Sequence, residues 1–366
     1  MRIYIISFVL NMLFGLLLCV KGDGVIEYDE LNQNVRKRKI YLLVTAIQLG
    51  LICGLRSSRM AYDTAAYELI FNLSANSWEH IFDKTSYVEV GFRVLCSIVK
   101  ILGGNYQTLL LITSMFVMGS CCLFIYRHSK DVILSVFIIV CFPFFYSTFD
   151  IIRHFLASSF FLIGYKYIVD RKPVRYLIFI ILGSLFHSAA WIFLPFYFLK
   201  MVKLNWRTVC AASLSTIMLY VYIGPIGSWL SNILGKTNLE ESGWIDSYGG
   251  GVRTAIMYGV ILLIAVIAFL QIKEKNKNDE IAVIYILIMV MCSVVFINAR
   301  MMTRVMMTMV SLMAIAIPQL FDKRRSKMPR DLLALKLSFI AIGLAYHTFM
   351  LLTNWQNVVP YIPYWR

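Results

Sequence analysis

The sequence predicts an all-α polytopic membrane protein, and two features carry this prediction. Of the 366 residues, 60% are hydrophobic and only 15% are charged. The apolar residues form runs close to the roughly 20 residues that an α-helix needs to cross a bilayer. Short clusters of lysine and arginine separate these runs. We therefore expect a single polytopic membrane domain over residues 1–366, and we interpret the net charge of +15 as topology information, with no nucleic-acid partner.

The basic clusters determine the expected threading, because short cytoplasmic loops retain lysine and arginine. Every cluster becomes cytoplasmic if the chain starts outside, crosses about twelve times and ends outside. The clusters lie at Arg36–Lys39, Arg127–Lys130, Arg171–Arg175, Lys200–Arg207, Lys273–Lys277 and Lys323–Arg330.

The expected helices follow from the apolar runs taken in order. The first run has no basic leading region beyond Arg2, and no small-residue cleavage site precedes Lys21, so we expect a retained helix rather than a signal peptide. The expected spans are residues 3–20, 40–55, 106–126, 132–149, 154–169, 174–186, 188–200, 207–224, 254–272, 281–298, 302–320 and 332–352.

Two segments depart from a simple count of apolar runs. Val88–Leu102 is short and carries three charged residues, so we expect a re-entrant or interfacial segment on the outer side. Tyr176–Leu199 is expected to form two short helices that meet at the sequence "FHS", because one long helix would place the cluster at 171–175 outside. This threading puts His187 at the outer tip of a helical hairpin.

The expected outer segments collect ionisable residues. These segments are residues 56–105, 149–154, 225–253, 299–303 and the tail 353–366. A charge at the centre of a membrane helix costs about 2.5 to 3.5 kcal/mol, and less near the interface, so charges kept there are paired or functional. Guanidinium groups bind phosphate through a planar fork, which predicts an anionic ligand. The candidates are Arg56, Asp63, Glu89, Asp150, Arg153, His187 and Arg304.

Each candidate also has a structural explanation. His187 would be satisfied by a backbone carbonyl at the hairpin tip, and Arg153 would form an ion pair with Asp150 three residues earlier. Arg56 would extend to lipid headgroups. Aromatic side chains on the outer side, such as Trp244 and Tyr248, offer flat surfaces to sugar rings but also suit an interfacial belt.

The cysteines do not indicate a metal site or a disulfide framework. All eight lie inside or at the edge of apolar runs, without a CxxC pair and without a histidine at ligand spacing. Free buried thiols are therefore expected, and we expect no metal and no cofactor.

A series of motifs in chain order carries a resemblance to a known family. The motifs are "LRSSRMAYDTAAY", "EVGF", "FDIIRHFLA", "FHSAAWIFLP", a late helix that bears arginine, and a tail with "VPY". In this order they resemble the EpsG family of Wzy-type polysaccharide polymerases. Two departures stand out: Ala61 and Tyr62 precede Asp63 where a spacer with glycine is more usual, and His154 stands where glutamine is common.

The resemblance implies an activity and a set of partners. Such proteins join oligosaccharide repeat units carried on undecaprenyl pyrophosphate, at the outer face of the bacterial inner membrane, and are thought to have an all-helical, GT-C-type membrane glycosyltransferase fold. The implied partners are the lipid-linked oligosaccharide, membrane lipids, and a chain-length regulator and a flippase of the same pathway. The residues on the family's recurrent positions are Arg56, Asp63, Glu89, Arg153 and His187.

Chemistry and resemblance together suggest roles for the candidates. His187, Asp63 and Glu89 are expected to be catalytic, because the attacking hydroxyl needs a base. Residues expected to bind pyrophosphate or sugar are Arg56, Arg153, Asp150, Arg304, Trp244 and Tyr248.

Two other functions remain open. A transporter or flippase of lipid-linked oligosaccharides would also need arginines, but it should carry polar groups through the membrane midplane, and few occur there. A membrane acyltransferase that modifies surface sugars would also use a histidine among apolar residues, placed deeper or facing inward.

Overall fold

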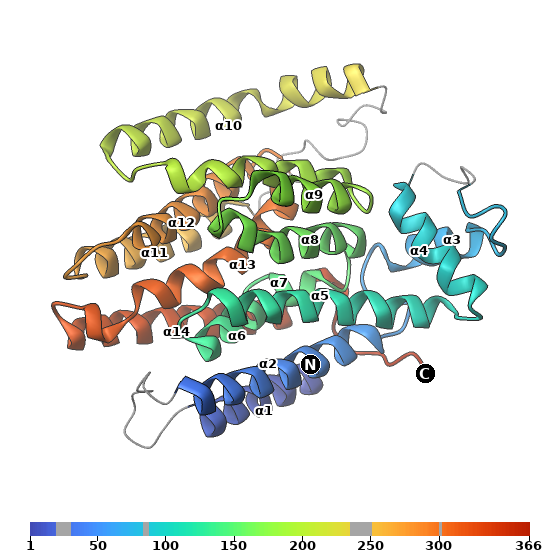
Figure 1. The fold of residues 1–366 in the computed structure, drawn as a ribbon, viewed down its shortest axis with the longest axis horizontal. Helices are drawn as coiled ribbons and strands as arrows, with labels where there is room; N and C mark the ends of the chain where they lie inside the picture. Colours follow the sequence, from blue (N-terminus) through green and yellow to red (C-terminus); the bar gives the residue numbers. More distant parts are fainter. Residues whose placement is uncertain (20–30, 83–87, 235–250, 300–301) are drawn as a thin grey trace. The chain divides into compact units, whose positions relative to one another are not determined.

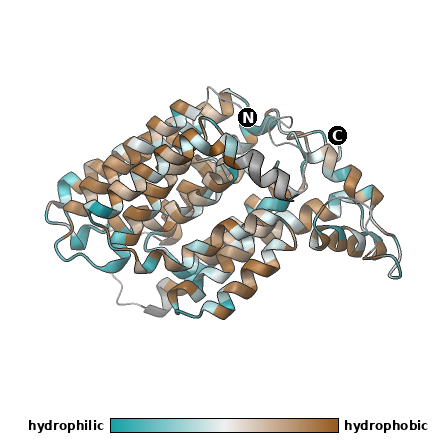
Figure 2. Cartoon of the chain, turned by 90° about the horizontal axis from the view of Figure 1, so that it is seen from above, coloured by the Kyte–Doolittle hydropathy of each residue, from teal (hydrophilic) through white to brown (hydrophobic). Residues whose placement is uncertain are grey.

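The computed structural model describes residues 1–19, 31–82, 88–234, 251–299 and 302–366. These residues form α-helices, three 3-10 helices and two isolated β-bridges (Figure 1). Apolar residues run along the helices, and hydrophilic residues gather at helix ends and in connecting loops (Figure 2). Seven described helices are long and apolar enough to cross a membrane: α1 (Arg2–Cys19), α5 (Tyr106–His128), α10 (Trp206–Leu234), α11 (Gly251–Leu270), α12 (Lys277–Val295), α13 (Met302–Leu320) and α14 (Pro329–Leu352). The chain is an all-α multi-pass membrane protein, as the composition predicts.

The remaining helices are shorter or carry charged ends. Most lie within a few residues of their expected bounds, but α2 starts at Leu31 rather than at residue 40. They are α2 (Leu31–Gly54), α3 (Thr64–Leu73), α4 (Val90–Ile101), α6 (Val132–Cys141), α7 (Phe144–Ser147), α8 (Ile152–Val169), α9 (Pro173–Ser184) and the 3-10 helices η1 (Ser188–Met201), η2 (Lys323–Arg325) and η3 (Trp355–Asn357).

The chain divides into two compact units. Residues 1–197 and 343–366 form the first unit, and residues 198–342 form the second. In the first unit α2 packs along α5, and α8 packs along α9 (Figure 1). The two ends of the chain meet there, because the hydroxyl of Tyr4 donates to the carbonyl of Val358 at 2.7 Å.

The expected single helix over residues 132–149 is wrong, because it breaks at Phe142–Pro143. Proline lacks the N–H that continues a helix, and it disfavours helical geometry in the residue before it. Phe142 accordingly has extended backbone, with φ −110° and ψ 170°. The short helix α7 and a buried turn at Phe149 and Asp150 follow before α8 begins. This turn brings polar backbone groups into the interior of the first unit.

The predicted reversal of the chain at His187 is confirmed. The hydroxyl of Tyr176 in α9 donates to the carbonyl of Phe193 in η1 at 2.5 Å, and its ring stacks with that of Tyr197 at 5.8 Å between centroids. Pro195 lies inside η1, where it cannot donate an N–H bond. A 3-10 helix of this length spans about 28 Å at about 2.0 Å per residue, close to the roughly 30 Å of a bilayer core.

Helix α4 docks on the tip of this hairpin. Its twelve residues span about 18 Å, which is too short to cross a bilayer. The N–H of Gly91 donates to the carbonyl of Leu185 at 2.8 Å. A Cβ at Gly91 would lie 2.7 Å from that carbonyl oxygen, so only glycine allows this approach. The "EVGF" motif therefore attaches to the hairpin tip.

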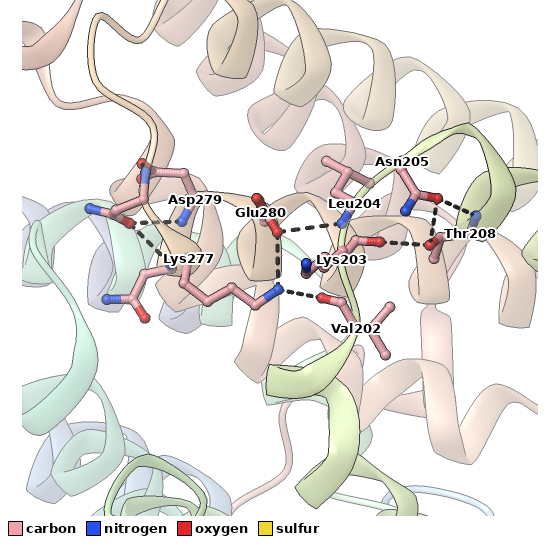
Figure 3. Close-up of polar contacts among 10 residues, drawn as sticks. Val202, Lys203, Leu204, Asn205, Thr208, Lys277, Asp279 and Glu280 are labelled. Carbon is pink, nitrogen blue, oxygen red and sulfur yellow. Dashed lines mark hydrogen bonds and ion pairs between the residues drawn. The ribbon is translucent and has the colours of Figure 1, made fainter.

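Polar contacts in the second unit join three of the basic segments, and Figure 3 shows the contacts between residues 202–208 and 277–280. The ammonium group of Lys277 donates to the carbonyl of Val202 at 2.5 Å and to Glu280 at 3.0 Å. Arg325 holds the fully buried carboxylate of Asp279 with bonds of 2.9 and 2.5 Å. The clusters at 200–207, 273–277 and 323–330 therefore lie at one end of this unit, as a shared cytoplasmic side requires.

Candidate functional site

An ion pair at the hairpin tip forms the centre of the candidate site. Glu89 directly precedes α4, Arg153 lies in the first turn of α8, and Ser188 begins η1. Arg153 Nη1 donates to Glu89 Oε2 at 2.5 Å, and the N–H of Ser188 donates to Glu89 Oε1 at 3.1 Å. Both carboxylate oxygens of Glu89 are therefore engaged. The side chains of Arg153 and Glu89 remain 18% and 22% exposed, so the pair is reachable from outside the protein.

His187 caps the start of η1. Its Nδ1 accepts the N–H of Ala189 at 3.0 Å, which is the bond that an N-cap side chain makes. A neutral imidazole has one acceptor and one donor nitrogen. With Nδ1 used as the acceptor, Nε2 carries the proton. The geometry therefore makes His187 a hydrogen-bond donor at Nε2.

His154 is a functional candidate that the sequence analysis left without a role. It is buried, directly follows Arg153, and its ring meets that of His187 edge to face at 5.8 Å between centroids. The hydroxyl of Ser158 lies 3.4 Å from its Nε2. In the sequence, His154 was notable only because glutamine is common at this position in the family. That difference did not indicate a contact with His187.

Tyr67 connects helix α3 to the ion pair. The guanidinium carbon of Arg153 lies 5.8 Å from the centroid of the Tyr67 ring, within range of a cation–π contact. The N–H of Tyr67 donates to the carbonyl of Asp63 at 3.1 Å, one helical turn earlier. Asp63 occupies the N-cap position of α3, but its carboxylate makes no capping bond and is half-buried. Asp63 therefore lies one helical turn before Tyr67, the residue of α3 that contacts Arg153.

Asp150 connects the turn before α8 to the start of α3. Its Oδ1 accepts the N–H of Asp63 at 2.7 Å, and the carboxylate is buried. Burial and the nearby charge of Asp63 raise the pKa of Asp150 to about 6, against hydrogen bonds from the backbone of Asp63 and Tyr62. Arg153 forms its ion pair with Glu89, so the alternative of a structural pair between Arg153 and Asp150 is wrong.

Arg56 lies fully inside the first unit. Its Nη1 donates to the carbonyl of Cys53 at 2.5 Å and its Nη2 to the carbonyl of Phe149 at 2.6 Å. The guanidinium carbon also lies 5.3 Å from the centroid of the Phe149 ring. These contacts hold the turn that the break at Pro143 creates. A role of Arg56 in binding pyrophosphate stays a prediction.

The C-terminal tail lies along the loop that contains Arg56. Arg56 and Pro363 form an isolated antiparallel bridge, and the N–H of Ser57 donates to the carbonyl of Ile362 at 2.8 Å. Further along, the N–H of Ala61 donates to the carbonyl of Asn357 at 3.2 Å. Ala61 has a left-handed backbone with φ 66°, a conformation that glycine adopts without cost. This explains why a spacer with glycine suits this loop.

The other predicted site residues are less well placed. Arg304 lies in the first turn of α13 in the second unit, and its role stays a prediction. Trp244 and Tyr248 lie outside the described residues. The described part of the chain holds no group of three or more metal-ligating side chains. The cysteines are free; six are buried, as the sequence predicts, whereas Cys292 is half-buried and Cys210 is exposed.

Comparison with known proteins agrees with the resemblance seen in the motifs. The family model described as "EpsG family" matches residues 39–362. No curated protein and no solved structure matches the chain. Because the family model covers most of the sequence, this chain belongs to the EpsG family, which is associated with exopolysaccharide biosynthesis.

Proposed function

We propose that this protein is a polymerase that joins undecaprenyl-pyrophosphate-linked oligosaccharide repeat units at the outer face of the bacterial inner membrane. The proposal includes a topology of about twelve crossings, with the candidate site outside, and a GT-C-type architecture. The observation that carries it is the junction of Arg153, Glu89 and the start of η1. This junction offers donors for a diphosphate, and Asp63, one helical turn before the Tyr67 ring that contacts Arg153, supplies a further carboxylate.

Arg153 and His187 supply the donors for the leaving diphosphate. Nε of Arg153 is buried and has no hydrogen-bond partner among the described residues. The guanidinium group stays charged at any physiological pH and matches phosphate oxygens in a planar fork. His187 adds the Nε2 donor, held in orientation by the bond from Ala189. Donors fixed in this way stabilise charge that develops as the bond from sugar to phosphate breaks.

Asp63 is the best-placed base. Both oxygens of Glu89 are engaged, and Nδ1 of His187 accepts a backbone N–H, so neither offers a free lone pair in this geometry. The carboxylate of Asp150 is buried under the backbone of Asp63. The carboxylate of Asp63 is half-buried and accepts no hydrogen bond from the described residues. It is therefore available to accept a proton.

The proposed reaction is a single group transfer. A hydroxyl oxygen of the acceptor sugar attacks the anomeric carbon of the donor, and its proton passes to Asp63. The bond between that carbon and the diphosphate oxygen breaks, and the electron pair leaves with undecaprenyl pyrophosphate. Arg153 and His187 stabilise the negative charge on the leaving group. Glu89 holds Arg153 in position through their ion pair. It holds His187 in position through the N–H of Ser188, the next residue along the chain.

Lipid-linked glycans of a deletion strain test the proposal. Loss of a polymerase should leave single repeat units on the lipid carrier at the outer face, and the wild-type gene should restore polymer. Arg153→Gln should fail to restore it at normal protein levels. Arg59→Gln, a change to an exposed arginine of the neighbouring loop, is the matched control and should restore it.

Three results would contradict the proposal. Repeat units trapped on the inner face would indicate a flippase. Polymer of normal length that lacks an acyl group would indicate an acyltransferase. Full polymer from Arg153→Gln would remove the arginine from the reaction.

A further inference from the structure

The turn Asn354–Asn357 in the C-terminal tail has an unusual backbone. Asn354, Gln356 and Asn357 all have left-handed geometry, with φ of 52°, 60° and 52°. This geometry costs about 1 to 2 kcal/mol for most residues other than glycine, with asparagine the best tolerated. Backbone strain of this kind concentrates at binding and active sites. The turn is therefore a candidate for function.

Several hydrogen bonds hold the strained turn in place. Asn354 accepts the N–H of Val359 at 2.6 Å and donates to the side chain of Asn357 at 3.2 Å. Tyr4 of α1 donates to the next carbonyl along, that of Val358. The turn is fixed before any ligand arrives, which lowers the entropy cost of binding.

The turn lies beside the proposed base. The carbonyl of Asn357 accepts the N–H of Ala61, two residues before Asp63. Tyr62, between these two residues, exposes 66% of its surface. A base must lie within hydrogen-bond reach of the hydroxyl from which it takes a proton. The acceptor sugar therefore has to lie next to this turn.

The chemistry of the turn suits a neutral sugar. No residue of Asn354–Asn357 is charged. The indole Nε1 of Trp355 is buried without a hydrogen-bond partner among the described residues, which costs about 1 to 3 kcal/mol until a partner is found. The amide of Gln356 is half-buried and makes no hydrogen bond within the described residues. Uncharged donors and acceptors beside an exposed ring match sugar hydroxyls better than a diphosphate.

We propose that the turn Asn354–Asn357, together with Tyr62, is the subsite for the acceptor sugar of the lipid-linked oligosaccharide. Trp355 Nε1 donates to one sugar hydroxyl, the amide of Gln356 binds another, and the ring of Tyr62 packs against the sugar ring. This inference rests on the proposed polymerase function and adds the binding of the second substrate. It assigns phosphate binding and sugar binding to separate parts of the site.

Binding of a phosphate-free oligosaccharide tests the subsite. The probe is the repeat-unit oligosaccharide released from the host's own surface polymer, titrated by calorimetry against the purified full-length protein in detergent. Trp355→Phe keeps an aromatic side chain and removes the N–H, and Gln356→Gly removes the amide while suiting the left-handed backbone. Each variant should raise the Kd about tenfold. Trp365→Phe, at an exposed position of the same tail, is the control and should bind like wild type.

The outcomes separate this inference from the proposed function. Wild-type affinity in both tail variants, or no binding by the wild-type protein, overturns the subsite. Arg153→Gln should bind the oligosaccharide normally yet make no polymer. If Arg153→Gln makes normal polymer while the tail variants lose binding, the proposed reaction fails and the subsite stands. If Arg153→Gln makes none while the tail variants bind and polymerise normally, the subsite alone fails.

Discussion

Asp150→Asn should stabilise the protein at neutral pH, because the buried carboxylate is costly when ionised. Burial and the charge of Asp63 raise its pKa from 3.8 to about 6. At about 1.4 kcal/mol for each pKa unit, this difference corresponds to roughly 3 kcal/mol. Because the pKa of Asp150 is higher in the folded state, its protonated form contributes to the free energy of unfolding. This contribution is complete below pH 4 and is lost as the pH rises through about 6. Asparagine keeps an acceptor for the N–H of Asp63 but cannot ionise.

Thermal unfolding followed by tryptophan fluorescence measures this effect in detergent. The melting temperature of the wild type should fall between pH 4 and pH 7.5, and the fall should be smaller in Asp150→Asn. The variant should therefore be the more stable protein at pH 7.5 and about equal at pH 4. Asp170→Asn, at an exposed turn, controls for the loss of one charge. A variant less stable than wild type at pH 7.5 would show that the ionised carboxylate is net stabilising and would refute the reasoning.

Three further substitutions probe other contacts. His187→Asn keeps an acceptor for the N–H of Ala189 but lacks the Nε2 donor. The amount of polymer should therefore fall at least tenfold at normal protein levels. A normal amount of polymer would show that His187 acts only as a helix cap. Gly91→Ala places a Cβ 2.7 Å from the carbonyl oxygen of Leu185 and should lower the free energy of unfolding by about 1 to 3 kcal/mol. Thermal unfolding measures this, with Val90→Ala as the control. An unchanged melting temperature would contradict the close docking of α4. Asp279→Asn breaks the buried ion pair with Arg325 and should lower the free energy of unfolding by about 3 kcal/mol. The amount of polymer made per folded molecule should stay normal. A lower amount per folded molecule would show that the polar cluster around Asp279 takes part in function directly.

The helices were largely predictable because their cause is local. Apolar runs of membrane length specify α5, α12 and α13 within a few residues. The hairpin at His187 was predictable from a global constraint, since all basic clusters must share one side. The break at Pro143 was missed although its signal was present, because the apolar run continues through the proline while the backbone does not.

The contacts of the site were not predictable, because they join residues far apart in sequence. Glu89 and Arg153 were both candidates, but no pattern indicated that they pair across 64 positions. The only pairing that the sequence suggested, as an alternative to phosphate binding, was between Arg153 and Asp150, because a single sequence shows spacing within one segment only. The orientation of His187 depends on one backbone N–H, that of Ala189, and so it also required the structure.

The site is built at helix N-termini, and this explains how its charges are divided. Asp63 and Glu89 are the N-cap residues of α3 and α4, whereas Arg153 and His187 stand at the starts of α8 and η1. Each helix start carries unpaired N–H groups and a partial positive charge, so it favours anions. At α3 and α4 the carboxylates offset that charge. At α8 and η1 a guanidinium and an imidazole donor add to it. In the proposed reaction the diphosphate therefore binds at these two helix starts, and the acceptor sugar binds at the uncharged tail beside α3.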